Sequence, residues 1–210
     1  MTDIFSQMEE TGLVPVIQID SAEDAVPLAR ALLAGGVNIA EVTFRTEAAE
    51  GSIRRITLEC PKMTVFAGTV LTLEQAKKAL RAGAKAIVSP GYDDQIVDWC
   101  MKKNATVIPG VSTASEVQHA VKKGLSVLKF FPAEACGGTK FLNAIRGPFA
   151  KVRFMPTGGI SEENFTAYAK LKNVIAVSGS WLCTKENIGL KEWDKITEAC
   201  KKSQREFPRS

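Results

Sequence analysis

A strand followed by a helix is repeated along the whole chain, and this repeat constrains the fold more than any other feature. Short β-branched runs begin at intervals of roughly 19 to 27 residues, the length of a strand–helix pair. Most intervals hold an amphipathic helical segment, such as Leu73–Ala84, and several of these segments end in glycine before the next strand. The strand candidates are LVPVIQI, VNIAEV, MTVFAG, KAIVS, ATVIPG, LSVLKF, KVRFMP and NVIAVSG.

Eight such units predict a (β/α)8 TIM barrel, an α/β fold. The 210 residues allow one substantial core, and no linker divides them, so we expect one barrel domain over residues 1–210. A doubly wound open sheet is the alternative, but it would normally show a glycine-rich turn after its first strand, and VIQIDSAEDA contains no glycine. In a barrel, the catalytic groups lie at the carboxyl ends of the strands and in the loops that follow them.

Composition and charge argue against several classes of protein. Apolar residues make up 45% of the chain, but no apolar run approaches the ~18 residues of a membrane span. The net charge of +4 is spread along helical segments, which favours a solvated surface over a nucleic-acid interface. Five dispersed cysteines, and an acidic N-terminus without an export signal, predict reduced thiols in the cytoplasm. The sequence therefore indicates an ordinary globular protein with neither a nucleic-acid nor a membrane partner.

The single histidine, His119, lies in a helical segment and is expected at the surface or at its boundary. Without clusters of histidine and cysteine, we expect no metal site.

One strand candidate carries an unexpected charge. Lys129 lies in the apolar run VLKFF, where alternation places Val127, Lys129 and Phe131 on one face of the strand. If that face is the lumen, burial disfavours the ammonium form and leaves an amine that can attack a carbonyl carbon. Glu41 is embedded in the same way in IAEVT, where a desolvated carboxyl group can transfer protons. The alternative is a buried ion pair that only holds the two strands in register.

Residues suited to anions follow several strands. Gly158 and Gly159 precede a helix whose N-cap we expect at Ser161, and exposed amides there, or in SGSW after the last strand, suit a phosphate. The alternative is that these glycines only permit tight turns. Arg45 suits a carboxylate, unless it pairs with a neighbour such as Glu47. Together with Lys129, these residues indicate an imine-forming enzyme that acts on a small phosphorylated keto acid.

Eight motifs, taken in order, resemble those of the bacterial 2-keto-3-deoxy-6-phosphogluconate (KDPG) aldolases, which often also cleave 4-hydroxy-2-oxoglutarate (KHG). The resemblance covers residues 12–182 and implies a class I, Schiff-base aldolase of the Entner–Doudoroff pathway. It implies a homotrimer and no cofactor, with pyruvate and glyceraldehyde 3-phosphate as products from KDPG. The motifs are VPVI, GGVNIAEVTFRT, FAGTVL, SPG, IPGVSTASE, LKFFPAE, PTGGI and SGSWL.

The resemblance also assigns a role to each candidate residue. Lys129 would form the Schiff base with the C2 ketone, and Glu41 would be the general acid and base, acting through water on the substrate hydroxyl. The residues that would bind the substrate are Arg45 and Thr69 at the carboxylate, Phe131 and Pro90 in the pocket wall, Gly158, Gly159 and Ser180 at the phosphate, and Thr157 near the hydroxyls.

Two residues depart from the family pattern, and rival activities remain open. Phe66 and Ser178 stand where many relatives carry glycine; Phe66 would narrow the lumen, and Ser178 would add a hydrogen bond to the phosphate or have no effect. One rival is the aldolase for the galactonate epimer, whose relatives tend to have an apolar residue where Thr157 stands. Another is a phosphate-binding barrel isomerase or synthase that uses Lys129 only as a fixed charge. A third is a binding module without catalysis.

Overall fold

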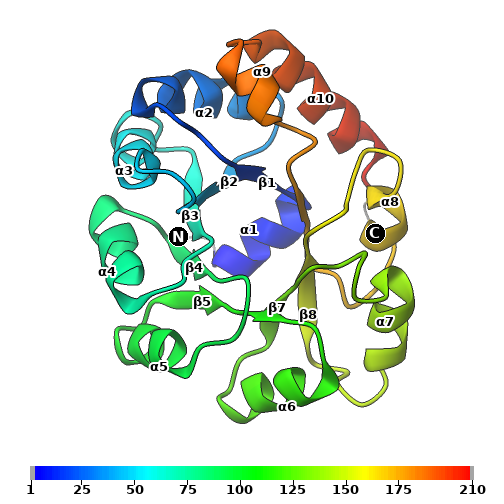
Figure 1. Ribbon diagram of the computed structural model, residues 1–210. Helices are drawn as coiled ribbons and strands as arrows, with labels where there is room; N and C mark the ends of the chain where they lie inside the picture. Colours follow the sequence, from blue (N-terminus) through cyan, green and yellow to red (C-terminus); the bar gives the residue numbers. More distant parts are fainter. Residues whose placement is uncertain (1–2, 209–210) are drawn as a thin grey trace.

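Parallel strands form a barrel, and helices surround it as an outer ring (Figure 1). The structure is a computed structural model, and it describes residues 3–208. Each predicted run contains a strand, and the fifth run forms two short strands separated by Pro109. The strands are β1 (Leu13–Ile17), β2 (Ile39–Thr43), β3 (Thr64–Gly68), β4 (Ala86–Val88), β5 (Thr106–Ile108), β6 (Gly110–Val111), β7 (Val127–Phe130), β8 (Arg153–Pro156) and β9 (Val177–Gly179).

The pairing of the strands closes the barrel. One sheet has the order β5-β4-β3-β2-β1-β9, and a second has the order β6-β7-β8. A parallel bridge between Thr157 and Ser178 joins the end of β8 to β9, and the chain itself continues from β5 through Pro109 into β6. The predicted α/β barrel is therefore confirmed, and the alternative of a doubly wound open sheet is wrong.

The helices begin and end where short sequence signals place them. The predicted helix Leu73–Ala84 stops at Ala82, because Gly83 adopts a left-handed conformation (φ 104°), while the side chain of Thr72 accepts the N–H of Gln75 at the other end. The helices are α1 (Ile4–Thr11), α2 (Ala25–Ala34), α3 (Ala49–Glu59), α4 (Leu73–Ala82), α5 (Asp94–Lys102), α6 (Ala114–Lys122), α7 (Gly138–Ile145), α8 (Phe165–Ala169), α9 (Lys185–Gly189) and α10 (Trp193–Glu206), with a 3-10 turn, η1 (Ala22–Asp24).

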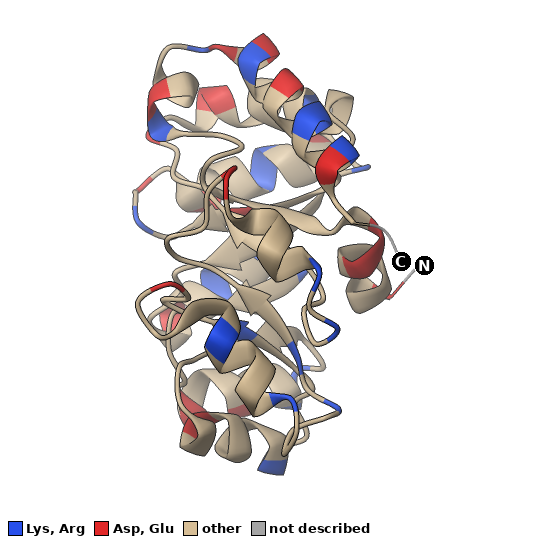
Figure 2. Cartoon of the chain, turned by 90° about the vertical axis from the view of Figure 1, so that its right-hand side faces the viewer, with Lys and Arg blue, Asp and Glu red and all other residues tan. Residues whose placement is uncertain are grey.

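The core has an outer and an inner part. The outer core lies between the strands and the ring of helices, whereas the inner core fills the amino-terminal half of the lumen with residues such as Ile39, Phe66 and Met155. Helix α1 closes this end, because Met8 is fully buried against the inner core. Figures 1 and 2 show α1 across one end of the barrel, which leaves the carboxyl end open for a site.

The outer surface carries charges of both signs. Figure 2 shows acidic and basic residues interspersed along the helices of the ring. Among the described residues, no helix combines the length and the apolar character that crossing a bilayer requires.

Candidate active site

Lys129 and Glu41 lie in the lumen at the same level. Because barrel strands are tilted, inward side chains from alternate strands form layers of four. The registers around the barrel place Glu41, Val88, Lys129 and Ser178 in one such layer. Val127 belongs to the inner core, whereas Leu128 and Phe130 belong to the outer core. The predicted alternation along β7 is therefore confirmed, and the lysine faces the lumen.

The amine and the carboxylate are hydrogen-bonded to each other. Nζ of Lys129 donates to Oε1 of Glu41 at 2.8 Å, and the two side chains are 5% and 0% exposed. The ion pair considered from the sequence is thus present, and the same bond offers a path for a proton from the ammonium to the carboxylate. In the layer, Val88 lies on one side of the pair and Ser178 on the other. Oε2 of Glu41 and Oγ of Ser178 are both buried without a protein partner among the described residues.

Gly68 makes room for the carboxylate. A Cβ atom at this position would lie 2.2 Å from Oε1 and 2.5 Å from Cγ of Glu41. The motif FAGTV contains this glycine, but no role was assigned to it from the sequence. A glycine inside a strand often marks a close approach by another group, and here that group is the side chain of Glu41.

Arg45 and Thr69 form a second polar unit at the carboxyl ends of β2 and β3. Nε of Arg45 donates to Oγ1 of Thr69 at 3.1 Å. Thr69 has a left-handed backbone conformation (φ 53°), which is uncommon for a β-branched residue and often marks a functional position. Among the described residues, no carboxylate lies within ion-pair distance of Arg45, so the alternative of a salt bridge to Glu47 is wrong. The exposed guanidinium group is thus positioned to bind an anion.

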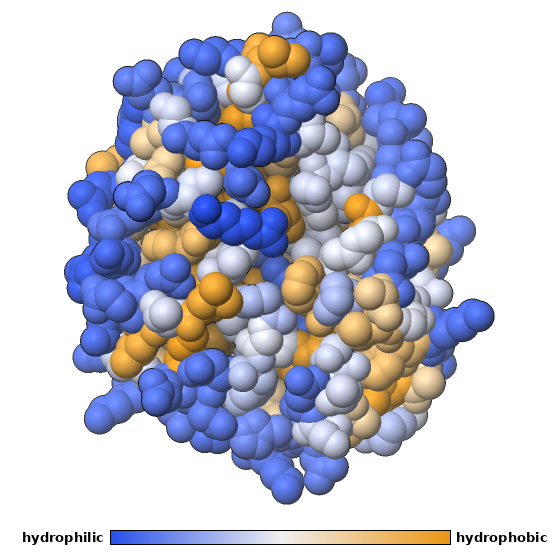
Figure 3. Space-filling model, in the orientation of Figure 1, coloured by the Kyte–Doolittle hydropathy of each residue, from blue (hydrophilic) through white to orange (hydrophobic). Residues whose placement is uncertain are grey.

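A cavity of about 360 Å³ opens at the carboxyl end of the barrel. Val16 lines it and is in register with Glu41, which places the buried pair below the cavity. Figure 3 shows this face of the molecule, where hydrophilic and apolar patches surround a hollow near the centre. The predicted residues in the lining are Arg45, Phe131, Thr157, Gly158, Gly159 and Ser180. The lining residues that the sequence did not single out are Val16, Gln18, Ile160, Gly179, Cys183, Thr184 and Lys185.

The other predicted residues lie around this cavity rather than in its lining. Lys129 and Glu41 are below it. Thr69 is hydrogen-bonded to Arg45, which does line the cavity. Pro90 follows β4, and its carbonyl oxygen would be 2.1 Å from a Cβ atom at Gly110. Any side chain at Gly110 would clash with the backbone of Pro90, so a second glycine, which was not singled out from the sequence, is required here.

The loop after β8 has the conformation of a turn that requires glycine. Gly158 (φ 102°) and Gly159 (φ 75°) are both left-handed. The loop is fixed by the segment after β7, since the N–H of Glu134 donates to the carbonyl oxygen of Gly158 at 3.1 Å. Within residues 3–208, no protein acceptor takes up the N–H of Gly158 or of Gly159. These two amides are therefore free to bind an anion.

The predicted N-cap at Ser161 is wrong. Helix α8 begins at Phe165, with Asn164 at the N-cap position. Ser161 instead starts a turn, in which its carbonyl oxygen accepts the N–H of Phe165 at 3.1 Å. Three residues thus separate the serine from the helix that it was expected to cap.

Phe66 and Ser178, the two departures from the family pattern, lie deeper than the glycine loop after β8. Phe66 is in register with Glu41 and is fully buried in the inner core, where it fills the lumen as expected. Ser178 lies in the layer of Lys129, two residues before Ser180. Its position does not support the expectation of a hydrogen bond to a phosphate.

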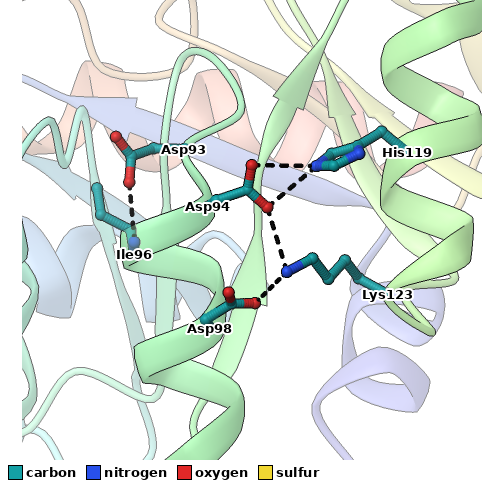
Figure 4. Close-up of polar contacts among 6 residues, drawn as sticks. All are labelled: Asp93, Asp94, Ile96, Asp98, His119 and Lys123. Carbon is teal, nitrogen blue, oxygen red and sulfur yellow. Dashed lines mark hydrogen bonds and ion pairs between the residues drawn. The ribbon is translucent and has the colours of Figure 1, made fainter.

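His119 lies outside the barrel, on the surface between α5 and α6, as predicted (Figure 4). Its Nε2 is 3.0 Å from Oδ1 of Asp94, and Nζ of Lys123 is 2.6 Å from Oδ1 of Asp98. Hydrogen bonds from His119 and Lys123 lower the pKa of Asp94. Among the residues that the structure describes, no group of three or more histidine, cysteine or acidic side chains is placed to hold a metal ion.

Comparison with known proteins gives a consistent result. The family "Aldolase: KDPG and KHG aldolase" matches residues 4–199. A 2-dehydro-3-deoxy-phosphogluconate aldolase of Treponema pallidum is 43% identical over 94% of both chains. The KHG/KDPG aldolase of Escherichia coli K12 is 45% identical over 91% of this chain and 90% of that protein.

A solved structure of KDPG aldolase from Legionella pneumophila holds pyruvate as a covalent carbinolamine intermediate. It superposes with a TM-score of 0.92 at 39% identity, over 96% of this chain and 98% of that one.

Proposed function

Because the chain belongs to the KDPG and KHG aldolase family, we propose that it cleaves KDPG to pyruvate and glyceraldehyde 3-phosphate, and KHG to pyruvate and glyoxylate. The observation that carries this proposal is the buried hydrogen bond between Lys129 and Glu41 below the cavity. It supplies a nucleophile and a proton acceptor from opposite sides of one lumen.

The reaction begins with transfer of a proton from Lys129 to Glu41. The free amine attacks the C2 ketone to give a carbinolamine, and the proton returned by Glu41 removes the carbinolamine hydroxyl as water. Glu41, acting through water, then accepts the proton of the C4 hydroxyl. The C3–C4 bond breaks and the aldehyde leaves. The electron pair of the broken bond passes into the iminium group, which becomes an enamine. Protonation of C3 and hydrolysis release pyruvate and the free lysine.

The remaining residues orient the substrate. Arg45, fixed by Thr69, binds the carboxylate next to the ketone, since a guanidinium group and a carboxylate form strong charge-assisted hydrogen bonds. Phe131 and Pro90 form the wall beside the imine. At the far end of the cavity, Gly158, Gly159 and Ser180 bind the phosphate, and Thr157 binds a substrate hydroxyl.

The isomerase or synthase alternative is less well supported. Such an enzyme would use Lys129 as a fixed positive charge, but the charge of Lys129 is compensated by the carboxylate of Glu41 at 2.8 Å. The epimer-specific aldolase differs more subtly. Aldolases for the galactonate epimer tend to have an apolar residue at the position of Thr157. Here Thr157 is buried in the cavity wall, and its hydroxyl favours the gluconate compound.

A coupled assay with lactate dehydrogenase tests the proposal, because it reports pyruvate continuously. KDPG, its galactonate epimer and KHG are compared in the wild type and in Lys129→Ala. We expect turnover of KDPG and KHG, slower turnover of the epimer, and loss of all three rates in the variant. Comparable turnover in Lys129→Ala would rule out the imine mechanism, and a faster rate on the epimer would reverse the assignment of substrate.

The same proposal extends to domain organisation, assembly and location. Residues 1–210 form a single barrel domain that assembles as a homotrimer in the cytoplasm. The resemblance to the KDPG and KHG aldolases implies the trimer, and the five free cysteines support a reducing compartment. Sedimentation velocity should give the mass of a trimer at micromolar concentration, and a monomer there would contradict this assembly.

A further inference from the structure

The cavity contains two cationic side chains among its described lining residues, and only one has a role so far. Arg45 follows β2, whereas Lys185 follows β9 and begins α9. The glycine loop and Ser180 supply neutral hydrogen-bond donors for a phosphate. Since a phosphate carries up to two negative charges at neutral pH, a cation at that end of the cavity would add a charge-assisted contact.

The backbone connects Lys185 directly to the phosphate end. The N–H of Cys183 donates to the carbonyl oxygen of Ser180 at 3.2 Å, so a tight turn leads from the serine to the lysine. Thr184 then caps α9, since its hydroxyl accepts the N–H of Asn187 at 3.1 Å. Ser180, Cys183, Thr184 and Lys185 all line the cavity. The lysine is thus attached to a fixed backbone, while its long side chain can turn.

Lys185 has a weak partner at the mouth of the cavity. Its Nζ lies 2.9 Å from Oδ2 of Asp20, in the loop after β1, and both side chains are 61% exposed. An exposed ion pair of this kind contributes little to stability and is easily exchanged. Gln18, two residues before Asp20, lines the same cavity. The pair therefore links two loops beside the cavity at little energetic cost.

We infer that Lys185 binds the substrate phosphate, and that it exchanges Asp20 for this phosphate when the substrate enters. Lys185 is then a specificity-determining residue, because KHG carries no phosphate and makes no use of it. Asp20 competes with the phosphate for the lysine, and it repels the phosphate once the lysine is removed. The inference rests on the proposed aldolase function and deepens it at one end of the site.

The experiment compares kcat and KM for KDPG and KHG in the wild type and in Lys185→Met, which keeps an unbranched side chain without the charge. Lys191→Met is the matched control. Lys191 is an exposed lysine just after the end of α9, it pairs with Asp24, and it does not line the cavity. We expect KM for KDPG to rise about tenfold or more in Lys185→Met, as for the loss of a hydrogen bond to a charged group. The KHG kinetics should stay within about twofold, and the control should match the wild type.

Two further measurements separate the parts of the inference. Inorganic phosphate should inhibit KDPG cleavage competitively in the wild type, and about tenfold more weakly in Lys185→Met. Asp20→Asn should lower KM for KDPG, because the competing carboxylate is gone. A higher KM for KDPG in Asp20→Asn would show that the aspartate does not compete with the phosphate.

Each result of the main comparison is decisive. An equal loss with both substrates would make Lys185 a structural residue, and unchanged kinetics with both would remove it from the phosphate site. Either result overturns the inference while leaving the aldolase function intact. If the wild type releases pyruvate from neither substrate, the proposed function itself fails. KHG turnover in Lys185→Met shows directly that this variant is folded.

Discussion

Replacing Gly68 by alanine tests whether Glu41 has to lie where it does. The new Cβ atom would stand 2.2 Å from Oε1, 2.5 Å from Cγ and 2.7 Å from Cδ of Glu41. Gly68 lies in β3 and does not adopt a left-handed conformation, so alanine meets no backbone strain there. The side chain of Glu41 must therefore move, by about 1 Å or more if ordinary packing distances are to be restored.

The size of the effect follows from this displacement. Overpacking of a core costs about 1–3 kcal/mol, and each kcal/mol lowers Tm by roughly 2–4 °C for a chain of this size. A displacement of about 1 Å of a catalytic group costs about 10²-fold in rate. Lys129 keeps its amine, so the imine with pyruvate should still form on long incubation, although more slowly because Glu41 also carries the protons of that step. We expect a folded enzyme that binds pyruvate covalently but cleaves KDPG about 10²-fold more slowly.

The assay combines three measurements on Gly68→Ala. The lactate dehydrogenase coupling gives kcat, borohydride reduction with pyruvate gives the covalent adduct, and thermal unfolding gives Tm. Gly147→Ala is the matched control, because no atom lies within 4 Å of a Cβ atom at that position. Wild-type kcat in Gly68→Ala would refute the reasoning, since Glu41 would then act from a displaced position.

Three other predictions concern single side chains. Glu41→Gln should still form the imine with pyruvate on long incubation because Lys129 is intact, but its kcat for cleavage should fall about 10²-fold or more because the proton acceptor is lost. Normal turnover in this variant would remove Glu41 from this role. Native protein should expose one fast-reacting thiol to Ellman's reagent at pH 8, the partly buried Cys136, because burial raises the pKa of Cys100 to about 11 and the other thiols are also buried; five fast thiols would contradict the packing. The hydrogen bond from His119 lowers the pKa of Asp94, so this interaction stabilises the fold above pH 3.8, and the stabilisation is lost as the pH falls through the lowered pKa. The Tm of Asp94→Asn should therefore be lower than that of the wild type at pH 7 and equal to it in acid, and a difference in Tm that does not change with pH would argue against this.

The fold could be predicted from the sequence because its signals are local. Each strand is a short β-branched run, and a glycine such as Gly83 ends a helix through its own backbone conformation. The burial of Lys129 and Glu41 could also be predicted, since a charge within an apolar strand is visible in the sequence itself. A contact between Lys129 and Glu41 across the lumen could be predicted only by assuming a closed barrel. The hydrogen bond between the two side chains confirms this contact.

Other features could not be predicted because they depend on packing between distant segments. Gly68 could be read as an ordinary small residue, since nothing in the sequence shows that Glu41 lies against it. The pair formed by Asp20 and Lys185 exists only because the last strand pairs with the first. Ser161 was expected at an N-cap because serine favours that position, but Asn164 is equally suited and lies next to the helix.

The most direct test of the account is the identity of the atom that binds the substrate. The protein is incubated with pyruvate and sodium borohydride, digested, and examined by peptide mass spectrometry. We predict one reduced pyruvyl group on the peptide that contains Lys129, with no such group in Lys129→Ala. An unmodified Lys129 in an enzyme that still releases pyruvate would contradict the central claim.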